Sequence, residues 1–564
     1  MHIKQDLSAR IEKVFATLGL DGQALVQNSS RPEYGDYQAN GIMAAAKRAG
    51  RNPREVATEV VAALDLQDIA GAVEIAGPGF LNITLAPEYL RHAKAGVVTQ
   101  TDKPLNIVVD YSAPNLAKEM HVGHLRSTII GDCIARVLEA QGHHVIRQNH
   151  VGDWGTQFGM LLTYMQDTGA ASNDLADLEN FYRAAKQKFD ADEEFQRRAR
   201  LAVVKLQGGD TQARMVWERF IDISMSHCTN IYGRLGVTLK RSDTMGESAY
   251  NDALAGVITS LDAQGLLQES DGAQCVFLEE FKSKKGDIQP VIVQKSDGGY
   301  LYATTDLAAV AYRTGTLNAA RVLYFTDARQ ALHFRQIFAV ATAGGFNKNA
   351  SRLEHMPFGA MLGEDGKPFK TRSGAVVKLA ALLDEAEQRA TALVKEKNPE
   401  LDDEKAQQLG KVIGIGAVKY ADLSKNRTSD YVFDWDLMIS FEGNTAPYLQ
   451  YAYSRIQSIF ARGNIDPEKL PTNTVAVDEA ERRLAVTIAG FNDTLENVAS
   501  EGLPHLLCGY VYELATRFTS FYEACPILSS TGEVKQRRLI LAKQTATTLK
   551  HGLEYLGIGV VDRM

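Results

Sequence analysis

The chain has 564 residues, a formal net charge of −8 at pH 7, and 45% hydrophobic and 23% charged residues. This length is too great for one hydrophobic core and predicts about three or four domains, while the composition is that of an ordinary soluble globular protein. No stretch of about 18 apolar residues is present to cross a membrane, and the polar start lacks the apolar core of an export signal. The five cysteines are scattered, which argues against a zinc ribbon or a disulfide framework and favours a cytoplasmic location.

The first segment, residues 1–103, is predicted to form a small α/β domain. Asn52 is a suitable N-cap for a helix that begins at Pro53, with Glu55 three residues after the cap. Residues 73–85 alternate in polarity as a strand does, with an interruption at Gly77-Pro78-Gly79. A local basic cluster flanks the helix start, and a solvated helix face is its simplest interpretation; its members are Lys47, Arg48, Arg51 and Arg54.

Residues 104–379 are interpreted as a Rossmann-like domain with a doubly wound parallel sheet. The apolar run 106–111 is typical of a buried parallel strand, and apolar residues then recur at helical spacing from Leu125 to Leu138. The next strand is expected at residues 144–151. A strand, loop, helix and strand in this order are the usual start of a doubly wound sheet.

The remaining sequence predicts an insertion and a helical tail. Residues from about 165 to 290 are highly charged and helical and then strand-like, which we interpret as a module inserted into the sheet domain. The sheet pattern resumes at residues 321–328. Nearly every segment of residues 380–564 has helical periodicity and is expected to form a helical bundle, so the predicted fold class is multidomain, α/β plus all-α.

A polar loop, His121-Val122-Gly123-His124, lies between the first parallel strand and its helix. Open α/β sheets bind ligands at this place, and the free N–H groups of a helix start suit phosphate. Gly123 would let a flat base approach the backbone, and His121 and His124 could donate hydrogen bonds to phosphate oxygens during attack at phosphorus. Alone, such a histidine pair is more often capped or packed, so the loop by itself leaves both roles open.

Several stretches, in chain order, resemble arginyl-tRNA synthetases. Residues 112–128, "SAPNLAKEMHVGHLRST", are similar to that family's form of the HIGH signature of class I aminoacyl-tRNA synthetases. Residues 367–374, "KPFKTRSG", resemble its form of the KMSKS loop. The other similar stretches are "YGDYQANG", "GPGFLNITL", "GDWGTQFG", "YLYATTDLAA", "DARQALHFRQ" and the helical tail from "NTAPYLQYAYSRI" onward. Together they span essentially the whole chain.

The resemblance implies an ATP-dependent arginine–tRNA ligase. Such an enzyme joins L-arginine to ATP as arginyl-adenylate, releases pyrophosphate, and transfers the arginyl group to the terminal ribose of tRNA(Arg), releasing AMP. It implies that His121, Gly123 and His124 bind ATP and stabilise the pentacovalent α-phosphate. No Asp/Glu cluster marks a metal site, so Mg²⁺ is expected to arrive with ATP.

The phosphate-binding lysines depart from the wider class. Lys370 keeps the first lysine of the KMSKS loop, whereas Ser373 stands at the second, which usually binds phosphate. Relatives with this loss carry a lysine just before the HIGH signature, and Lys118 occupies that place, although a solvated loop lysine is the commoner fate. Lys118, Lys370 and Arg372 are therefore expected at the phosphates, where a missing cation would weaken transition-state stabilisation.

Arginine recognition needs acceptors, because guanidinium is a planar fork of donors that pairs with carboxylate. Tyr302 and Asp306 lie four residues apart at an expected helix start and match the family's side-chain readers. Asn115 matches a residue that holds the α-amino and carboxylate groups. Asp110 either belongs to the same pocket or caps the turn after its strand, and Gln330 is expected to line that pocket.

The tRNA contacts are expected at both ends of the chain. The resemblance implies that the N-terminal domain contacts the D-loop corner of the tRNA, with Phe80, Asn82, Lys47 and Arg51 as candidates. Loop bases are recognised by stacking on aromatic groups, so the anticodon-binding tail is expected to use Tyr448 and Arg455, although aromatic residues at helical spacing are usually core. We expect a monomer that activates arginine only with tRNA bound.

Three alternatives remain open at this point. A small nucleotidylyltransferase would explain the HxGH loop but neither the second signature nor the flanking domains. A cysteinyl-tRNA synthetase would need a zinc-binding cluster, which the scattered cysteines do not offer. A non-catalytic RNA-binding paralogue would account for the lost loop lysine but not for the retained His121, His124 and Asp306.

Overall fold

The computed structural model describes residues 2–29, 31, 34–93, 95–169, 175–284, 286–367, 369 and 377–564. The chain forms two compact units, which we call the terminal and the central unit. The terminal unit contains Met1–Gln100, Ser440–Tyr555 and Gly559–Met564, and the central unit contains Thr101–Ile439 and Leu556–Ile558. No helix among the described residues is long and apolar enough to cross a membrane.

The central unit is built on a four-stranded sheet with the order β11-β10-β5-β6, in which all neighbours are parallel. Its strands are β5 (Asn106–Asp110), β6 (His144–Gln148), β10 (Arg321–Tyr324) and β11 (Arg352–His355). The order reverses between β5 and β10, because β6 follows on one side of β5 and β10 on the other. The expected doubly wound parallel sheet is confirmed, and its ligand-binding crevice lies at the carboxyl ends of these two strands.

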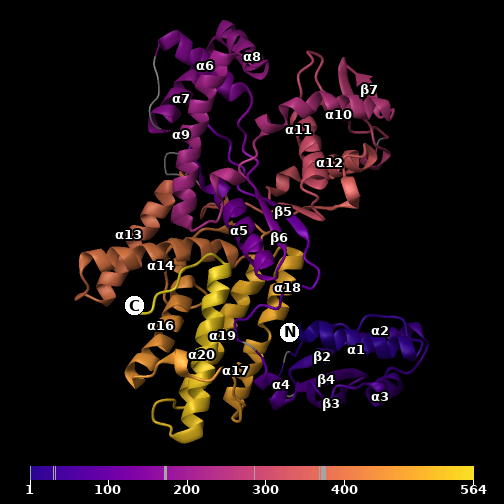
Figure 1. Ribbon diagram of the computed structural model, residues 1–564, viewed down its shortest axis with the longest axis vertical. Coiled ribbons are helices and arrows are strands. Elements are labelled where there is room, and N and C mark those ends of the chain that lie inside the picture. The colour runs from indigo at the N-terminus through magenta and orange to yellow at the C-terminus, as the bar shows by residue number, and fades with distance from the viewer. Residues whose placement is uncertain are drawn as a thin grey trace. The chain divides into compact units, whose positions relative to one another are not determined.

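Helices connect the strands and extend the unit (Figure 1). Helix α5 (Leu125–Ala140) joins β5 to β6, and α12 (Ala331–Ala343) joins β10 to β11. Between β6 and β10 the chain forms helices and a three-stranded antiparallel sheet; these elements are α6 (Thr156–Thr168), α7 (Leu175–Ala191), α8 (Glu193–Gln207), α9 (Thr211–Leu235), α10 (Asn251–Ala263), β7 (Leu267–Ser270), β8 (Ala273–Val276), β9 (Val291–Gln294) and α11 (Tyr302–Ala311). This run contains the expected insertion.

The terminal unit combines a small α/β part with a helical part. The α/β part has an antiparallel sheet in the order β1-β2-β4-β3; its elements are α1 (Ile3–Thr17), β1 (Val26–Asn28), β2 (Tyr37–Ala39), α2 (Gly41–Arg48), α3 (Pro53–Ala63), β3 (Ala70–Ala76), β4 (Phe80–Leu85) and α4 (Pro87–Arg91). The helical part contains α16 (Ala446–Gly463), α17 (Glu479–Ala489), α18 (Phe491–Glu501), α19 (Pro504–Ala524) and α20 (Gly532–Tyr555). Asn52 caps α3 as expected, accepting a hydrogen bond from the Arg54 N–H at 2.9 Å.

The division between the units differs from the boundary that we expected at residues 379 and 380. Helices α13 (Leu379–Lys397) and α14 (Asp403–Leu423) belong to the central unit, which continues through the β12–β13 pair (Met361–Leu362, Tyr431–Val432) and α15 (Trp435–Met438). Helical periodicity shows that a segment buries one face, but not which core receives that face. Here α14 is tied to α5 by a buried ion pair between Arg126 and Asp422, at 3.1 Å.

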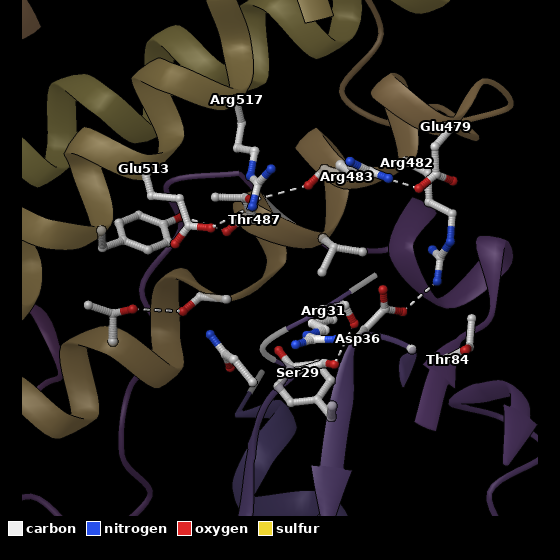
Figure 2. A pocket seen from close by; sticks show the side chains of 17 residues that line it. Ser29, Arg31, Asp36, Thr84, Glu479, Arg482, Arg483, Thr487, Glu513 and Arg517 are labelled. Carbon is white, nitrogen blue, oxygen red and sulfur yellow. Dashed lines mark hydrogen bonds and ion pairs between the residues drawn. The ribbon is translucent and has the colours of Figure 1, made fainter. Parts of the chain in front are cut away.

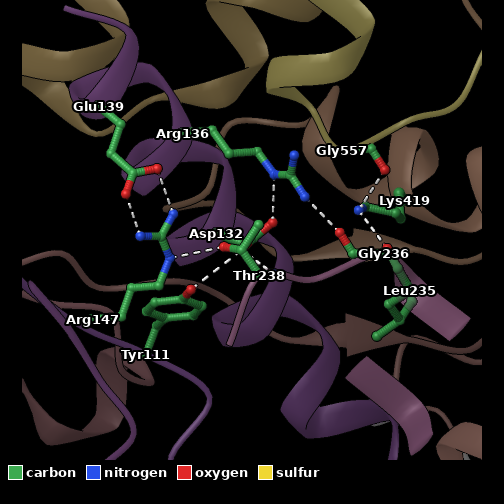
Figure 3. A network of polar contacts seen from close by, with 10 residues as sticks. All are labelled: Tyr111, Asp132, Arg136, Glu139, Arg147, Leu235, Gly236, Thr238, Lys419 and Gly557. Atoms are coloured by element: carbon green, nitrogen blue, oxygen red, sulfur yellow. Dashed lines mark hydrogen bonds and ion pairs between the residues drawn. The ribbon is translucent and has the colours of Figure 1, made fainter. Parts of the chain in front are cut away.

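A second polar network fixes the middle of α5 (Figure 3). The Asp132 carboxylate accepts hydrogen bonds from the Tyr111 hydroxyl at 3.2 Å, from the Thr238 N–H at 2.8 Å and from Arg136 at 2.7 Å. Nearby, the buried Lys419 ammonium donates to the carbonyls of Leu235 and Gly557, both at 2.7 Å. Burial lowers the pKa of Lys419 to about 8. Residues 556–558 are thereby held in the central unit.

The Arg126–Asp422 pair gives the first prediction. Both side chains are buried, so replacing Asp422 by Asn leaves an uncompensated guanidinium, which typically costs about 3–5 kcal/mol. We expect Asp422→Asn to lower the urea midpoint of the central unit, measured by equilibrium unfolding. Asp403→Asn is the matched control, because Asp403 is exposed on the same helix. Equal midpoints for the two variants would contradict the structural role of the pair.

Candidate active site

The loop between β5 and α5 follows an irregular path at the switch point of the sheet. Ser112, Ala113 and Ala117 adopt left-handed backbone conformations with φ of 72°, 43° and 74°, which cost residues other than glycine about 1 kcal/mol or more. Side chains from other segments hold this path. The Ser127 hydroxyl, the Asn149 amide oxygen and the Ser224 hydroxyl accept the N–H groups of Ser112, Ala113 and Ala117 at 2.9, 3.0 and 3.1 Å.

His121 and His124 are fixed by reciprocal capping of a short helical turn, Val122–His124. The Nδ1 atom of His121 accepts the Gly123 N–H, and the Nδ1 atom of His124 accepts the His121 N–H, both at 3.1 Å. An accepting Nδ1 of a neutral imidazole places the proton on Nε2. Both rings, whose centroids are 3.9 Å apart, therefore carry an Nε2–H donor for a ligand. No other described residue accepts either donor.

The two imidazoles are held neutral by their surroundings. Burial is the main cause that lowers the pKa of His121, and the positive charge of Lys118 adds to it. Burial and the neighbouring His121 lower the pKa of His124 to about 3. Neutral donors suit a phosphate whose charge moves during the reaction, because their hydrogen bonds stabilise the negative charge on the phosphate oxygens without transferring a proton.

Gly123 is required by the packing of the histidine rings. A Cβ atom on this residue would lie 2.8 Å from Cε1 and 2.9 Å from Nδ1 of His121, closer than real contacts allow. Any side chain at this position would therefore displace the ring and break the hydrogen bond that fixes its tautomer.

We call the loop between β5 and α5, residues 111–124, the histidine loop. The segment at 377–379 lies directly against it. The Val122 N–H donates to the Val377 carbonyl at 3.0 Å, and the Leu379 N–H donates to the Met120 carbonyl at 2.9 Å. The preceding residues Lys370 and Arg372, which we expected at the phosphates, lie outside the described residues, as does Ser373. Lys118 is described; it is exposed on the same loop as the histidines.

Tyr302 and Asp306 lie in the first turns of α11, and Asp306 faces two histidines. Its carboxylate contacts Nε2 of His333 at 2.6 Å and Nε2 of His150 at 3.9 Å. The Tyr302 side chain is exposed. A carboxylate and an accessible phenol one turn apart on a helix form an arrangement that can receive a guanidinium.

Glu247 is a further acidic residue near Asp306 and Tyr302 that the sequence did not reveal. It begins the short helical turn Glu247–Tyr250, which packs against α11. Burial, with the negative charges of Asp153 and Asp306, raises the pKa of Glu247 to about 8, and its charge acts on Tyr302 in turn. Glu247 lies in a short polar turn of the insertion, about 60 residues before Asp306, and no motif or spacing in the sequence connects the two residues.

Asp110 is engaged within the protein. Its carboxylate pairs with Arg313 at 2.8 Å, and both side chains are buried. Arg313 also donates to Gln148 at 3.0 Å and stacks on the Tyr324 ring. We considered a pocket residue and a turn cap for Asp110; the ion pair with Arg313 is a third arrangement, in which the carboxylate stabilises the carboxyl ends of β5 and its neighbours.

Asn115 and Gln330 are both exposed at the crevice. Asn115 forms an isolated parallel bridge with Gly152, and a Cβ on Gly152 would lie 2.1 Å from Oδ1 of Asn115. The "GDWGTQFG" stretch thus leaves room for this amide. Gln330 occupies the N-cap position of α12, one turn before His333, and its side chain does not cap the helix.

The expected tRNA-binding residues of the terminal unit are placed differently from one another. Lys47 is exposed, Arg51 pairs with Glu59, and Phe80 is half-buried. Asn82 is buried and its amide oxygen accepts a hydrogen bond from Gln38 at 2.8 Å. This engagement removes most of its accessible surface, because the two residues face each other on neighbouring antiparallel strands.

In the helical part, Tyr448 is half-buried and its ring lies 5.7 Å from that of Tyr512. Arg455 stacks on the Tyr522 ring at 4.9 Å. Packing of these groups accords with the usual fate of aromatic residues at helical spacing.

A polar cavity of about 380 Å³ lies in the terminal unit between its sheet and its helices (Figure 2). Asp36 lies at its base, where it accepts the Leu85 N–H at 2.7 Å and pairs with Arg482. Two arginines at its rim are paired with carboxylates on their own helices, Arg483 with Glu479 at 2.7 Å and Arg517 with Glu513 at 3.4 Å. Exposed pairs of this kind are weak, about 0–1 kcal/mol.

Among the described residues, one group of acidic and thiol side chains has the spacing of metal ligands: Asp478, Glu481 and Cys525. Its carboxylates are already paired with Arg537 and Arg538, at 2.7 to 3.1 Å. These guanidinium groups supply the positive charge that an ion would otherwise provide.

A parallel sheet that carries an HxGH loop at its switch point, in a unit that also brings Asp306 and Glu247 near each other, is the arrangement expected of a class I aminoacyl-tRNA synthetase. Family models agree. The model for "tRNA synthetases class I (R), catalytic domain" matches residues 87–435, the "Arginyl tRNA synthetase N terminal domain" matches residues 1–85, and the "DALR anticodon binding domain" matches residues 449–564.

Full-length relatives identify the family. The arginine–tRNA ligase of Marinomonas sp. (strain MWYL1) is 57% identical and that of Chromobacterium violaceum 54% identical, each with 100% of both chains covered. The crystal structure of arginyl-tRNA synthetase from Plasmodium falciparum has a TM-score of 0.87 at 30% identity, covering 100% of this chain and 99% of that chain. The chain therefore belongs to the arginyl-tRNA synthetase family, as its sequence motifs indicated.

The low pKa of His124 gives the second prediction. Its imidazole should stay neutral at pH 5 and gain a proton only near pH 3, whereas an ordinary histidine titrates near 6.5. Because the unfolded chain takes up this proton near pH 6.5, the buried neutral ring costs folding stability as the pH falls below that value. Imidazole nitrogen NMR over pH 4.5–8 checks the titration, with His124→Asn assigning the resonance. A midpoint near 6.5 would disprove the neutral donor.

Proposed function

We propose that this chain attaches L-arginine to tRNA(Arg) in two steps at the crevice between β5 and β10. In the first step an arginine carboxylate oxygen attacks the α-phosphorus of ATP, and the bond to the bridging oxygen breaks to release pyrophosphate. In the second step a hydroxyl of the terminal ribose of the tRNA attacks the carbonyl carbon and AMP leaves. The observation that carries the proposal is the pair of fixed Nε2–H donors on His121 and His124, which HxGH chemistry at a switch point requires.

The histidine loop is proposed to serve the first step. The Nε2–H groups of His121 and His124 would donate to phosphate oxygens, and Gly123 would leave space for the nucleotide beside them. Both donors are held in place before ATP binds, because their tautomers are set by backbone N–H groups. Preorganised donors lower the barrier without a reorganisation cost during the reaction.

Lysines are proposed to neutralise the leaving pyrophosphate. Lys118 is the described candidate, because it is exposed on the histidine loop and its charge is felt at His121. Lys370 and Arg372 are proposed as further ATP contacts from sequence alone. Mg²⁺ is proposed to enter with ATP, because hard dications bind phosphate oxygens and need few protein ligands.

The arginine side chain is proposed to bind between α11 and the turn at Glu247. Asp306 and Glu247 would accept the guanidinium donors, with Tyr302 closing the open side and Asn115 holding the α-amino and carboxylate groups. Gln330 is proposed at the margin of this pocket, and Asp110 supports it through Arg313. Lysine and neutral amino acids would leave these carboxylates unpaired, which disfavours them strongly.

The terminal unit is proposed to bind the tRNA. Its N-terminal part offers Lys47, Arg51 and Phe80 to the D-loop corner, while Asn82 would first have to release Gln38. Its helices offer Tyr448 and Arg455 to the anticodon loop. We also propose that the protein is a cytoplasmic monomer and that bound tRNA precedes arginine activation.

Pyrophosphate exchange into ATP tests the proposed function. We expect exchange with arginine and none with lysine or cysteine, appearing when tRNA(Arg) is added. His124→Asn should remove at least about 99% of the exchange, as the loss of a preorganised donor does in other enzymes, while tRNA binding persists. Exchange with cysteine would favour a cysteinyl enzyme, exchange without any amino acid a nucleotidylyltransferase, and tRNA binding without exchange a non-catalytic paralogue.

The raised pKa of Glu247 predicts a linked proton. Below pH 8 this carboxyl is largely protonated, and a guanidinium favours its ionised form. Arginine binding should therefore release a proton at pH 7, and its affinity should rise with pH up to about 8, by at most about tenfold per pH unit.

Calorimetric titration with arginine in two buffers of different ionisation enthalpy measures that proton. Glu247→Gln should bind arginine more weakly and abolish the pH dependence, whereas Glu279→Gln, at an exposed site in the same insertion, should change neither. A pH-independent affinity in the unaltered chain would remove Glu247 from the pocket.

A further inference from the structure

Helix α7 of the insertion lies against the histidine loop through Tyr182. The Lys118 ammonium is 4.7 Å from the centroid of the Tyr182 ring, within the range of a cation–π contact. Lys118 is otherwise an exposed side chain on a long flexible stem. The Tyr182 ring is the part of the insertion that the Lys118 ammonium contacts, so the ring restricts where the ammonium can lie.

A second contact joins the same helix face to the segment that follows residue 376. Lys378 binds Glu179 at 2.8 Å and Glu119 at 2.5 Å. Glu179 lies three residues before Tyr182, so both side chains project from one face of α7. Because Lys378 lies between the two residues that hydrogen-bond to Val122 and Met120, this cluster holds the segment that precedes α13 against the histidine loop.

Packing inside the insertion fixes the direction of that face. The Phe181 ring, adjacent to Tyr182, makes edge contact with Tyr164 at 4.9 Å and lies 6.5 Å from the Phe220 ring. These contacts tie α7 to α6 and α9. Tyr182 and Glu179 are therefore presented by a supported helix rather than by a loop.

The two lysines are held in chemically different ways. Burial opposes the charge of Lys378, but its hydrogen bonds to two carboxylates raise its pKa, so its positive charge is already compensated by Glu119 and Glu179. Lys118 is held by an aromatic face, which attracts the cation but leaves its charge and its hydrogen-bond donors available. A carboxylate in place of the ring would compete with phosphate for the ammonium.

We infer that Tyr182 and Glu179 are positioning residues for arginine activation: Tyr182 aims the Lys118 ammonium at the phosphates, and Glu179 holds Lys378 beside the histidine loop. The inserted helix thus contributes to the phosphate site without touching ATP. This inference rests on the proposed role of Lys118 and adds a segment of the chain to it.

Substitution of Tyr182 tests the inference in pyrophosphate exchange with saturating arginine and tRNA(Arg). Tyr182→Leu should lower kcat/KM for ATP by about twofold to fivefold, the loss expected for an exposed cation–π contact. Tyr182→Phe keeps the aromatic face and should remain within about twofold of the unaltered enzyme. Asn180→Ala, an exposed change two residues before Tyr182 and therefore on the other side of α7, is the matched control and should have no effect.

A double-substitution cycle with Lys118→Met separates positioning from packing. Tyr182→Leu added to Lys118→Met should cause no further loss, because the group that the ring positions is gone. Thermal unfolding of each variant shows whether α7 remains folded. Equal losses for Tyr182→Leu and Tyr182→Phe, or multiplicative losses in the double variant, would overturn the inference.

The same series distinguishes failure of the inference from failure of the proposed function. Lys118→Met alone should reduce exchange by about tenfold or more, as loss of a cation at developing charge does. If Lys118→Met retains full exchange, the phosphate role of Lys118 is wrong. If it loses exchange while Tyr182→Leu does not, only the positioning by α7 is wrong.

Discussion

The geometry of the site depends on how one irregular loop, residues 111–121, is held between β5 and α5. Three of its residues adopt backbone conformations that are unfavourable without glycine, and their N–H groups are accepted by side chains of Ser127, Asn149 and Ser224. These acceptors come from α5, from the end of β6 and from α9. The loop therefore takes its shape only when the sheet and the insertion are folded, which couples the histidine geometry to the whole central unit.

The described ionisable groups of the proposed site are not neutralised by one another, so charged substrates can serve as their partners. The two histidines are neutral, Lys118 retains its positive charge, and burial beside other carboxylates keeps Glu247 largely protonated until a cation arrives. A site with fixed charges of its own would have to be neutralised by internal partners, as Asp110 is by Arg313. The difference between Asp110 and Glu247 thus separates a carboxylate that supports the sheet from one that can respond to a guanidinium.

The sequence predicted the elements that local periodicity and capping determine. The strands at 106–110, 144–148 and 321–324, the helix start at Asn52 and the parallel sheet are found where they were expected. The HxGH loop was also recognisable, because its residue types and its place after a buried strand are contiguous in the chain. These features need no knowledge of distant contacts.

Features that depend on contacts between distant segments could not be predicted in the same way. The helical pattern of α13 and α14 does not reveal the Arg126–Asp422 pair that places them in the central unit. Asp110 and Asn82 were named as ligand contacts because of their positions in motifs, yet each is engaged by a residue from another segment, Arg313 and Gln38. Glu247 was missed for the converse reason, since its partner Asp306 is far away in sequence.

The insertion is an example of such distant contacts, because its helix α7 contacts Lys118 and Lys378, which lie next to the HIGH signature and after the KMSKS loop. In its proposed role, Lys118 must be positively charged, accessible and oriented toward the phosphates. These requirements conflict, because the usual way to orient a lysine is to pair it with a carboxylate, which compensates its charge. An aromatic face resolves the conflict, since it orients the ammonium while leaving its donors open. In the arrangement that we propose, a helix from outside the sheet provides that ring: α7 presents Tyr182 to Lys118, and Glu179 binds Lys378 in the segment that precedes α13. The composition of the inserted helix is then constrained by phosphate chemistry at the sheet, although none of its residues belongs to either signature.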